Sequence, residues 1–570
     1  MSAKDETAMT GAEAAVRMLA LHGVRHVFGL CGDTSLPFYD ALYRLDHGIT
    51  HVLTRDERSA AYMADGYARV SGRVGVCEGP SGGGATYLLP GLAEANESSV
   101  PVLGITSDVP VLSRGRYPLT ELDQEALYRP VTKWNGTIDH VDQVPSVFRT
   151  AFRAATSGRP GAAHVCLPYD VQKQPLGRPQ EVWADAAAGS APSRRSVADT
   201  AAIEAAAELM LGAANPVAIC GSGVVASGAS AELEELARLL NLAVCTTVSG
   251  KGALSDRSPF NAGVVGANGG VLATRAVVAA ADLVLFIGCR AGSTTTENWR
   301  FPRHGTRIVH IDVDPMVIGA NYPTDVGLLG DIRLTLAALL QVVRENLGQR
   351  NRAAQDGRVA VATARREKHG QFLPLAESSA TPIRPERVIF ELNRVLPEEA
   401  IVVADPGTPC PYVAAYLDLA RAGRHFLTNR AHGALGYAMS AAVGAWYAQP
   451  SSKVVAIMGD GSFGFTVGEL ETIARLEVPI VMIVLTNAVY GWIKASQKAG
   501  YGERYFSVDF SRTDHAAVAA AYGIEAVSVS DPAEVGAALR RALAADRPVL
   551  VDIAVQPLQD AQAPVSQWMG

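Results

Sequence analysis

The sequence between residues 454 and 492 carries residue types that could hold a metal ion and a phosphate group. An apolar run over 454–458 leads into Gly459-Asp460-Gly461-Ser462, and a second run over 480–485 leads into Thr486-Asn487. The glycines would let the backbone approach phosphate oxygens, and the Asp460 carboxylate and Asn487 amide oxygen are the hard ligands that Mg²⁺ prefers. A glycine turn with Asp460 as a simple cap is the alternative that these residues alone leave open.

A second candidate is Glu57, in the segment TRDERSAAYMADGYARVSG that begins at Thr54. An acid in the first turn of a helix is favoured by the helix dipole, so Glu57 could have a purely structural role. If its carboxyl is partly buried, it would hold a proton near neutral pH and could serve in general acid–base chemistry. The residues alone leave both roles open.

The elements that position these residues follow from the pattern of apolar runs. Short β-branched runs alternate with longer Ala/Leu-rich stretches, which is typical of parallel sheets with crossover helices and predicts an α/β fold. We expect three doubly wound parallel-sheet domains, over residues 1–176, 196–343 and 381–560, with a Rossmann-like central domain. Residues 177–196 are polar and carry prolines, and residues 344–368 are highly charged, so both segments are predicted to be linkers.

The predicted strands are the β-branched runs of each block. They cover residues 26–30, 74–77, 101–106 and 163–167 in the first block, 216–220, 243–247, 283–287 and 308–311 in the second, and 401–404, 454–458, 480–485 and 549–553 in the third. Asp460 and Asn487 then follow two strands of the third block, and α/β sheets bind ligands at the carboxyl ends of their strands. The first and third blocks could share a fold without sharing sequence.

Composition narrows the class of protein. The chain of 570 residues is 48% hydrophobic and has 57 acidic against 50 basic side chains, without a lysine or arginine block. We therefore expect small-molecule chemistry and neither a nucleic-acid nor a membrane partner. The first residues lack the apolar core of a signal peptide, and no later run reaches membrane-spanning length, so a cytoplasmic location is expected, with the seven scattered cysteines reduced.

The segment 454–492 also resembles a known signature. GDGSFGF, the step of 27 residues from Asp460 to Asn487, and the AVYG that follows resemble the thiamine-diphosphate site of the acetolactate synthase and pyruvate decarboxylase superfamily. The resemblance implies thiamine diphosphate and Mg²⁺ as cofactors, with the metal bound by Asp460, Asn487 and the backbone carbonyl of Val489. Thr486 departs from the family, which usually has a second asparagine there.

The same resemblance assigns further contacts with the cofactor. In NRAHGALGYAMSAAVGA, Leu435 would lie under the two rings, and the Gly433 carbonyl would accept a hydrogen bond from the 4′-amino group. The other implied contacts are Gly407, Thr408, Gly459, Gly461, Ser462, Tyr490 and Gly491. Glu57 matches the family's catalytic glutamate, whose carboxyl bonds to the pyrimidine N1′ and so favours removal of the thiazolium C2 proton.

The resemblance also has consequences for assembly. The first block would be the pyrimidine-binding domain and the third the diphosphate-binding domain, and in the family these two meet across a subunit interface. We therefore expect a homodimer or a dimer of dimers, a homotetramer, with each active site shared between two chains.

From about residue 10 to about residue 560 the chain resembles the catalytic subunit of acetolactate synthase, but several specificity positions differ. Ser496 stands where the synthases have a tryptophan that sorts the second 2-oxo acid, and Leu119-Thr120 replaces their phenylalanine-glutamine pair. His432 and Trp492 are further expected substrate contacts. Their RFDDR becomes RAGST at 290–294, and the loss of its second arginine argues against FAD, which stays a possible third cofactor.

The predicted function is a decarboxylase or carboligase that acts on a 2-oxo acid or a related acyl donor, with small carbonyl compounds as substrates and an altered acceptor site. A 2-hydroxyacyl-CoA lyase or another carbon–carbon lyase of the superfamily is the alternative, since relatives that bind CoA use the middle block for its nucleotide. A cofactor-binding protein without turnover is a third class, and the intact Glu57, Leu435, Asp460 and Asn487 argue against it.

Overall fold

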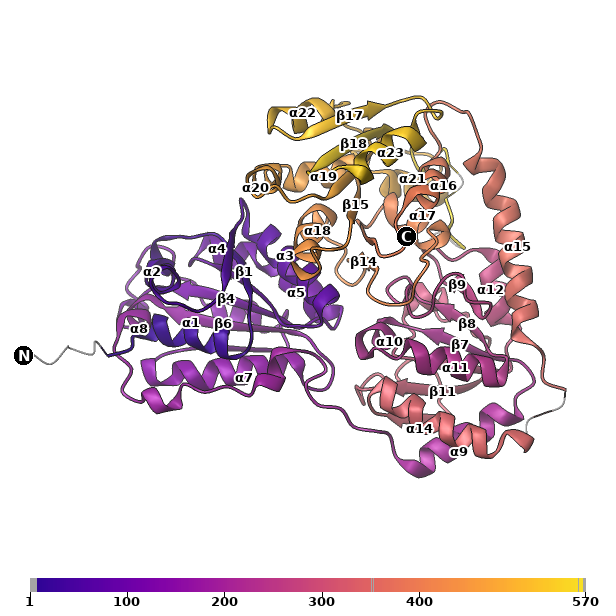
Figure 1. Cartoon of the computed structure of the whole chain (residues 1–570), viewed down its shortest axis with the longest axis horizontal. Helices are drawn as coiled ribbons and strands as arrows, with labels where there is room; N and C mark the ends of the chain where they lie inside the picture. The colour runs from indigo at the N-terminus through magenta and orange to yellow at the C-terminus, as the bar shows by residue number, and fades with distance from the viewer. Residues whose placement is uncertain (1–7, 350, 352, 562, 567–570) are drawn as a thin grey trace, which may run out of the picture. The chain divides into compact units, whose positions relative to one another are not determined.

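The structure is a computed structural model that describes residues 8–349, 351, 353–561 and 563–566; the first seven residues of the first predicted domain lie outside this part. Three six-stranded sheets with interleaved helices follow one another along the chain (Figure 1). Neighbouring strands run parallel in each of them. The predicted α/β fold with three parallel sheets is therefore confirmed.

The first sheet has the strand order β2-β1-β3-β4-β6-β5. Its strands are β1 (His26–Gly29), β2 (Thr50–Leu53), β3 (Gly75–Gly79), β4 (Val102–Asp108), β5 (Trp134–Thr137) and β6 (Ala162–Pro168). Its helices are α1 (Gly11–Leu21), α2 (Leu36–Arg44), α3 (Glu57–Ser71), α4 (Gly83–Tyr87), α5 (Leu89–Glu97), α6 (Gln124–Tyr128), α7 (Val144–Thr156) and α8 (Tyr169–Lys173). Helix α3 begins after its N-cap, Asp56, and ends at Gly72, whose left-handed φ of 71° closes it.

The central sheet has the order β12-β11-β10-β7-β8-β9. Its strands are β7 (Pro216–Cys220), β8 (Ala243–Thr246), β9 (Asn261–Val264), β10 (Leu283–Ile287), β11 (Arg307–Asp312) and β12 (Val326–Leu329). Its helices are α9 (Thr200–Gly212), α10 (Ser222–Ser227), α11 (Ser230–Leu240), α12 (Leu272–Ala279), α13 (Ser293–Thr296), α14 (Ile332–Glu345) and α15 (Gly357–Ala376). The order reverses between β7 and β10, which is the Rossmann arrangement.

The third sheet has the order β14-β13-β15-β16-β18-β17, which matches the first sheet strand for strand. Its strands are β13 (Ile401–Ala404), β14 (Phe426–Thr428), β15 (Val454–Gly459), β16 (Val481–Thr486), β17 (Glu525–Val529) and β18 (Val549–Ala554). Its helices are α16 (Pro385–Val395), α17 (Pro409–Tyr416), α18 (Tyr437–Ala448), α19 (Asp460–Thr466), α20 (Glu469–Arg475), α21 (Gly491–Gly500), α22 (His515–Ala521) and α23 (Val535–Ala544). The first and third blocks thus share a fold, as the sequence suggested.

All twelve predicted strands are present, and their ends differ from the prediction by two residues at most. The six strands that the prediction did not include are β2, β5, β9, β12, β14 and β17, the two edge strands of each sheet. These strands are three to five residues long, and β2, β5 and β12 are largely exposed or half-buried. An edge strand pairs on one side only, so its sequence carries a weaker apolar signal.

The two predicted linkers differ in structure. Residues 177–196 are irregular apart from short turns, as expected, and they pack back on the first sheet, where Val74 N donates to the Gly189 carbonyl at 3.0 Å. Residues 344–368 are not an irregular linker, because most of α15 lies within them and packs against α12 and α16. Val361 and Ala364 supply the buried face that the charged sequence concealed.

By their contacts, the residues form two units. The first holds the chain up to Arg194 together with Ala431–Pro450 and Thr466–Leu476, and the second holds the rest. In the first unit, α18 packs directly on α3. A Cβ atom on Gly66 would lie 2.2 Å from the Ala441 carbonyl oxygen, so this crossing requires glycine.

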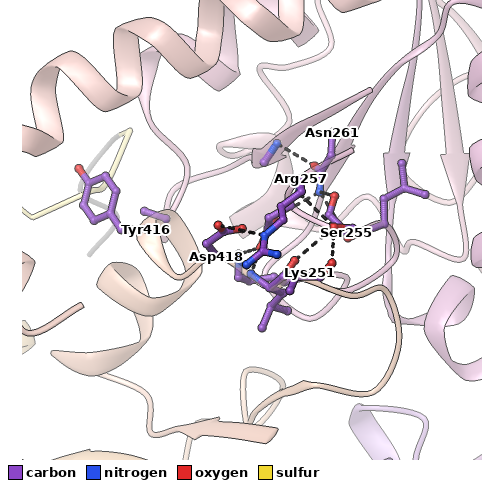
Figure 2. A network of polar contacts seen from close by, with 12 residues as sticks. Lys251, Ser255, Arg257, Asn261, Tyr416 and Asp418 are labelled. Atoms are coloured by element: carbon purple, nitrogen blue, oxygen red, sulfur yellow. Dashed lines mark hydrogen bonds and ion pairs between the residues drawn. The ribbon is translucent and has the colours of Figure 1, made fainter. Parts of the chain in front are cut away.

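A polar network in the second unit joins the loop after β8 to the segment after α17 (Figure 2). The Asp256 carboxylate accepts from Lys251 Nζ at 2.6 Å and from Leu419 N at 2.9 Å. Arg257 pairs with Asp418 at 3.6 Å in the same region. These contacts explain why the central and third sheets belong to one unit.

Candidate active site

Asp460 is the first residue of α19, directly after β15, and its carboxylate is held in a fixed position. Its Oδ1 accepts from Gly461 N at 2.8 Å, and its Oδ2 accepts from Asn487 N at 2.8 Å and Ala488 N at 2.6 Å. The side chain is buried, and burial raises the pKa of the Asp460 carboxyl while the three backbone donors oppose that shift. The structure therefore brings Asp460 and Asn487 together, at the carboxyl ends of β15 and β16, as predicted.

The turn after β16 has a special backbone geometry. Ala488 has a left-handed φ of 56°, which is uncommon for a residue with a side chain and marks a constrained turn. Asn487 Nδ2 is buried and has no hydrogen-bond partner within the described residues. Val489 is buried and forms an isolated bridge with Asp509. The unsatisfied amide suits a phosphate oxygen, since buried donors are normally paired.

The predicted cofactor glycines divide into two kinds. At Gly459 and at Gly407, which has a φ of 90°, no atom lies within 4 Å of the place that a Cβ would occupy. At Gly461 a Cβ would lie 2.8 Å from the Tyr490 ring, and at Gly491 it would lie 2.9 Å from Thr408 Oγ1. Gly461 and Gly491 are therefore also required by local packing, whereas Gly459 and Gly407 leave open space, and the predicted phosphate contact of Gly461 stays a prediction.

Ser462 and Thr486 are anchored by buried acids. Ser462 Oγ donates to Asp405 Oδ2 at 2.6 Å, which ties the turn after β15 to the turn after β13. Thr486 Oγ1 donates to Asp552 Oδ1 at 2.5 Å, and His515 N donates to Asp552 Oδ2 at 3.2 Å. The sequence interpretation missed this support of the Asn487 turn; an acid inside the apolar strand VLVDIA was the available signal.

Tyr490 is the N-cap of α21, Trp492 lies in its first turn and Ser496 lies in its middle. Tyr490 is 38% exposed, while Trp492 is half-buried and packs against the core of the third sheet. Ser496 Oγ donates to the Trp492 carbonyl at 3.0 Å, within its own helix. Trp492 is thus partly a core residue, and its substrate contact stays a prediction.

Glu57 belongs to the other unit, as the first residue of α3. Its side chain is 6% exposed, so it is more than a solvent-facing acid at a helix start. A Cβ on Gly84 would lie 2.9 Å from Glu57 Oε1, and one on Gly79 would lie 3.2 Å from its Cγ. Burial raises the pKa of Glu57, its own backbone N–H opposes the shift, and the neighbouring Asp56 adds to it. The carboxyl therefore has the burial that proton storage requires.

Thr120 lies at the glycine loop that also contacts Glu57. Thr120 Oγ1 lies 2.7 Å from Ser81 Oγ, and a Cβ on Gly82 would lie 2.8 Å from the Thr120 Cβ. Leu119 is 89% exposed. Of this predicted substrate pair, the structure brings only Thr120 to the loop beside Glu57.

His432, Gly433 and Leu435 follow β14 and belong to the same unit as Glu57. Gly433 has a φ of 74°, and no atom lies within 4 Å of the place that a Cβ would occupy there. Leu435 is half-buried. The backbone N–H groups of His432 and Gly433 both donate to Glu94 Oε2, at 2.7 and 3.4 Å, a contact that the sequence interpretation missed.

Comparison with known proteins supports the assignment of a cofactor to this geometry. The thiamine pyrophosphate enzyme N-terminal TPP binding domain matches residues 9–127, the central domain matches 203–339 and the C-terminal TPP binding domain matches 405–553. A probable acetolactate synthase large subunit from Methanococcus aeolicus is 35% identical over 566 residues, which cover 96% of this chain and 92% of that protein. The chain belongs to the thiamine pyrophosphate enzymes.

Other relatives are also similar along almost the whole chain. A probable acetolactate synthase large subunit from Methanocaldococcus jannaschii is 35% identical, with 97% of this chain and 93% of that protein covered. Glyoxylate carboligase from Escherichia coli O157:H7 is 30% identical, with 98% and 94% covered. This thiamine pyrophosphate enzyme thus resembles proteins that are named for more than one activity.

The residues of the third sheet fit the cofactor that defines the family. Within the described residues, no three His, Cys, Asp or Glu side chains come together as a metal site. The candidate site instead offers one carboxylate, one amide and one backbone carbonyl, and Mg²⁺ commonly completes such a set with phosphate and water. The unpaired Asn487 Nδ2 offers a donor to such a phosphate, and the backbone at Gly459 leaves open space.

The glycines and acids at the strand ends of the central sheet have structural contacts of their own. A Cβ on Gly221 would lie 2.0 Å from the Gly288 carbonyl oxygen, and one on Gly223 would lie 2.7 Å from Gly288 Cα. Asp312 accepts from Asp314 N at 2.9 Å. Packing and turn formation therefore explain these residues without a nucleotide.

Across the described residues, no helix combines the length and apolar character needed to cross a bilayer.

Proposed function

We propose that the chain is a Mg²⁺- and thiamine-diphosphate-dependent decarboxylase or carboligase that acts on a 2-oxo acid or a related acyl donor. The observation that carries the proposal is the Asp460 carboxylate, held by three backbone N–H groups beside the Asn487 amide at the ends of two parallel strands. Relatives named as acetolactate synthases and as glyoxylate carboligase support the reaction class. Thiamine diphosphate supplies a nucleophilic carbon and an electron sink for breaking or forming a bond beside a carbonyl carbon.

In this proposal the Asp460 site binds the metal and the diphosphate, and Glu57 takes part in proton transfer. Asp460, Asn487 and the Val489 carbonyl hold the metal, while the open backbone at Gly459 and Gly407 admits the diphosphate. Glu57 holds a proton on its carboxyl and shares it with the pyrimidine nitrogen, a role supported by its burial and raised pKa. The remaining predicted contacts, Thr408, Gly433, Leu435, Ser462, Tyr490 and Gly491, would orient the cofactor.

We further propose a homodimer, or a dimer of dimers, in the cytoplasm. Glu57 and the Asp460 site belong to different units of the chain, and each active site would combine Glu57 of one subunit with the metal site of its partner. Leu119, Thr120, His432, Trp492 and Ser496 would shape the acceptor side.

The test is CO₂ release from pyruvate and a panel of other 2-oxo acids under nitrogen, followed by mass spectrometry of the products. We expect release to need both added cofactors, to stop with a chelator and to return with excess Mg²⁺. Parallel reactions without thiamine diphosphate are the control. Full turnover in chelator, or no turnover on any donor by protein shown to bind the cofactor, would contradict the proposal.

A further inference from the structure

Glu94 is a fully buried acid in α5 whose two oxygens serve different parts of the structure. Oε1 accepts from Ser98 Oγ, the C-cap of the same helix, at 2.5 Å and from Arg69 Nη2 of α3 at 3.1 Å. Oε2 accepts from the backbone N–H groups of His432 and Gly433. The side chain therefore links the core of the first sheet to the loop before α18, all within one unit.

The charges around Glu94 show why this link is strong. Arg69 also pairs with Asp65, at 2.6 Å, and the Tyr437 hydroxyl donates to the same Asp65 oxygen at 2.5 Å. One guanidinium thus faces two buried carboxylates, and a buried carboxylate is costly unless hydrogen-bond donors surround it. The two loop N–H groups supply donors to the oxygen of Glu94 that faces away from Arg69, so the loop and the acid stabilise each other.

The conformation of Gly433 is not fixed by packing of a side chain of its own. Gly433 has a left-handed φ of 74°, and a Cβ there would touch nothing within 4 Å, so side-chain packing does not determine its conformation. Glycine is also the residue with the largest backbone freedom. The hydrogen bonds from the His432 and Gly433 N–H groups to Glu94 therefore restrict the backbone on the N-terminal side of the Gly433 carbonyl.

We propose that Glu94 is a positioning residue, which holds the backbone at His432 and Gly433 so that the Gly433 carbonyl can accept from the 4′-amino group of thiamine diphosphate. The inference rests on the proposed function, because it takes the cofactor contact of Gly433 as given. It adds a residue from α5 that does not itself touch the cofactor.

Glu94→Gln is the first test, because an amide has only one acceptor oxygen. If that oxygen faces Arg69, the NH₂ group meets the loop N–H groups; if it faces the loop, the NH₂ group meets Arg69. We expect hydrogen–deuterium exchange of the amides at 432 and 433 to rise roughly 10-fold or more in the cofactor-free protein. In the cofactor-bound protein, C2 proton exchange should slow roughly 10- to 100-fold, with a smaller change in cofactor affinity.

The matched control is Glu97→Gln, which makes the same change at an exposed position of the same helix and should alter neither readout. Unchanged amide exchange and unchanged C2 exchange in folded Glu94→Gln protein would overturn the inference. If wild-type protein itself shows no cofactor-dependent C2 exchange, the proposed function fails instead, and the amide-exchange result still reports on the Glu94 contact.

A second pair of variants decides the case if Glu94→Gln does not fold. His432→Ala keeps the backbone N–H, whereas His432→Pro removes it, and neither changes the buried core. We expect the proline variant to have the slower C2 exchange and the less protected Gly433 amide of the two. Equal values for both variants would overturn the inference.

Discussion

The first and third sheets have the same strand order but carry different chemistry at their carboxyl ends. After the edge strand β2 the chain reaches Glu57, and after the corresponding strand β14 it reaches the loop with Gly433. After β3 comes the glycine loop that packs on Glu57, and after the corresponding β15 comes the Asp460 turn. A shared topology therefore sets where groups are presented, and the loop residues set what the groups do.

The two buried acids show this difference most clearly. Burial raises the pKa of both, but three backbone N–H groups oppose the shift at Asp460 and only one does so at Glu57. Backbone donors aimed at a carboxylate favour its charged form and so suit a metal ligand. A carboxyl placed against glycines with few donors favours the protonated form and suits proton transfer.

The largest expected effect is that of Asp460→Ala on the third sheet. Removing a charged ligand should weaken cofactor and Mg²⁺ binding by at least about 100-fold, since even outer-shell changes at metal sites cost 10- to 100-fold. Titration calorimetry measures the loss, and circular dichroism should show an intact fold. Asp514→Ala, at the N-cap of α22, is the control for removing an acid. Normal cofactor affinity in Asp460→Ala would contradict the assignment of Asp460 as the metal ligand and of Glu57 alone to proton transfer.

The second prediction concerns Glu57→Gln, which should keep cofactor binding but slow C2 proton exchange by roughly 10²- to 10⁴-fold, the usual contribution of a general acid or base.

If each site is shared, mixing this inactive variant with inactive Asp460→Ala should restore activity. Random exchange of dimer subunits makes about half the dimers hybrid, each with one intact site of two, so about one quarter of wild-type activity should return. Mass spectrometry verifies the exchange, and no recovery after verified exchange would place the site within one chain.

The sequence predicted the interior of each sheet well and its edges poorly. Interior strands are buried on both faces and read as continuous apolar runs, whereas β2 and β14 are short and pair on one side only. These two edge strands lead directly into Glu57 and into the Gly433 loop. The residues themselves were found by resemblance, but the strands that position them were not.

Contacts between residues far apart in the chain were also not predicted from the sequence. Glu94 is one of two acids in α5, and nothing in its local pattern indicates that its carboxylate meets the N–H groups at 432 and 433. The Thr486, His515 and Asp552 contacts likewise join three elements. Such partners depend on tertiary packing, which local periodicity does not encode.

A third prediction compares one glycine from each sheet. Gly459→Ala adds a methyl group into open space, so the cofactor-free protein should keep its stability while cofactor affinity falls. Gly84→Ala puts a methyl group 2.5 Å from Pro80 Cδ and 2.9 Å from Glu57 Oε1, so it should destabilise the cofactor-free protein by roughly 1–3 kcal/mol. Thermal unfolding with and without cofactor separates the two outcomes. Equal destabilisation by both variants would show that the glycines have the same structural role.

The smallest expected effect is a pH dependence of stability that originates at Glu57. Its pKa in the folded protein is raised above the ordinary 4.5, because burial disfavours the charged form. The folded state therefore binds this proton more tightly than the unfolded state does, and the resulting stability is fully present below pH 4.5 and is lost as pH rises through the folded pKa.

Glutamine does not ionise, so the free energy of unfolding of wild-type protein relative to Glu57→Gln should fall as pH rises from 4.5. Urea unfolding of cofactor-free protein across that range measures the difference. A difference that stays constant with pH would mean that Glu57 ionises as freely in the fold as in the unfolded chain, and the proton-holding role assigned to the first sheet would lose its physical basis.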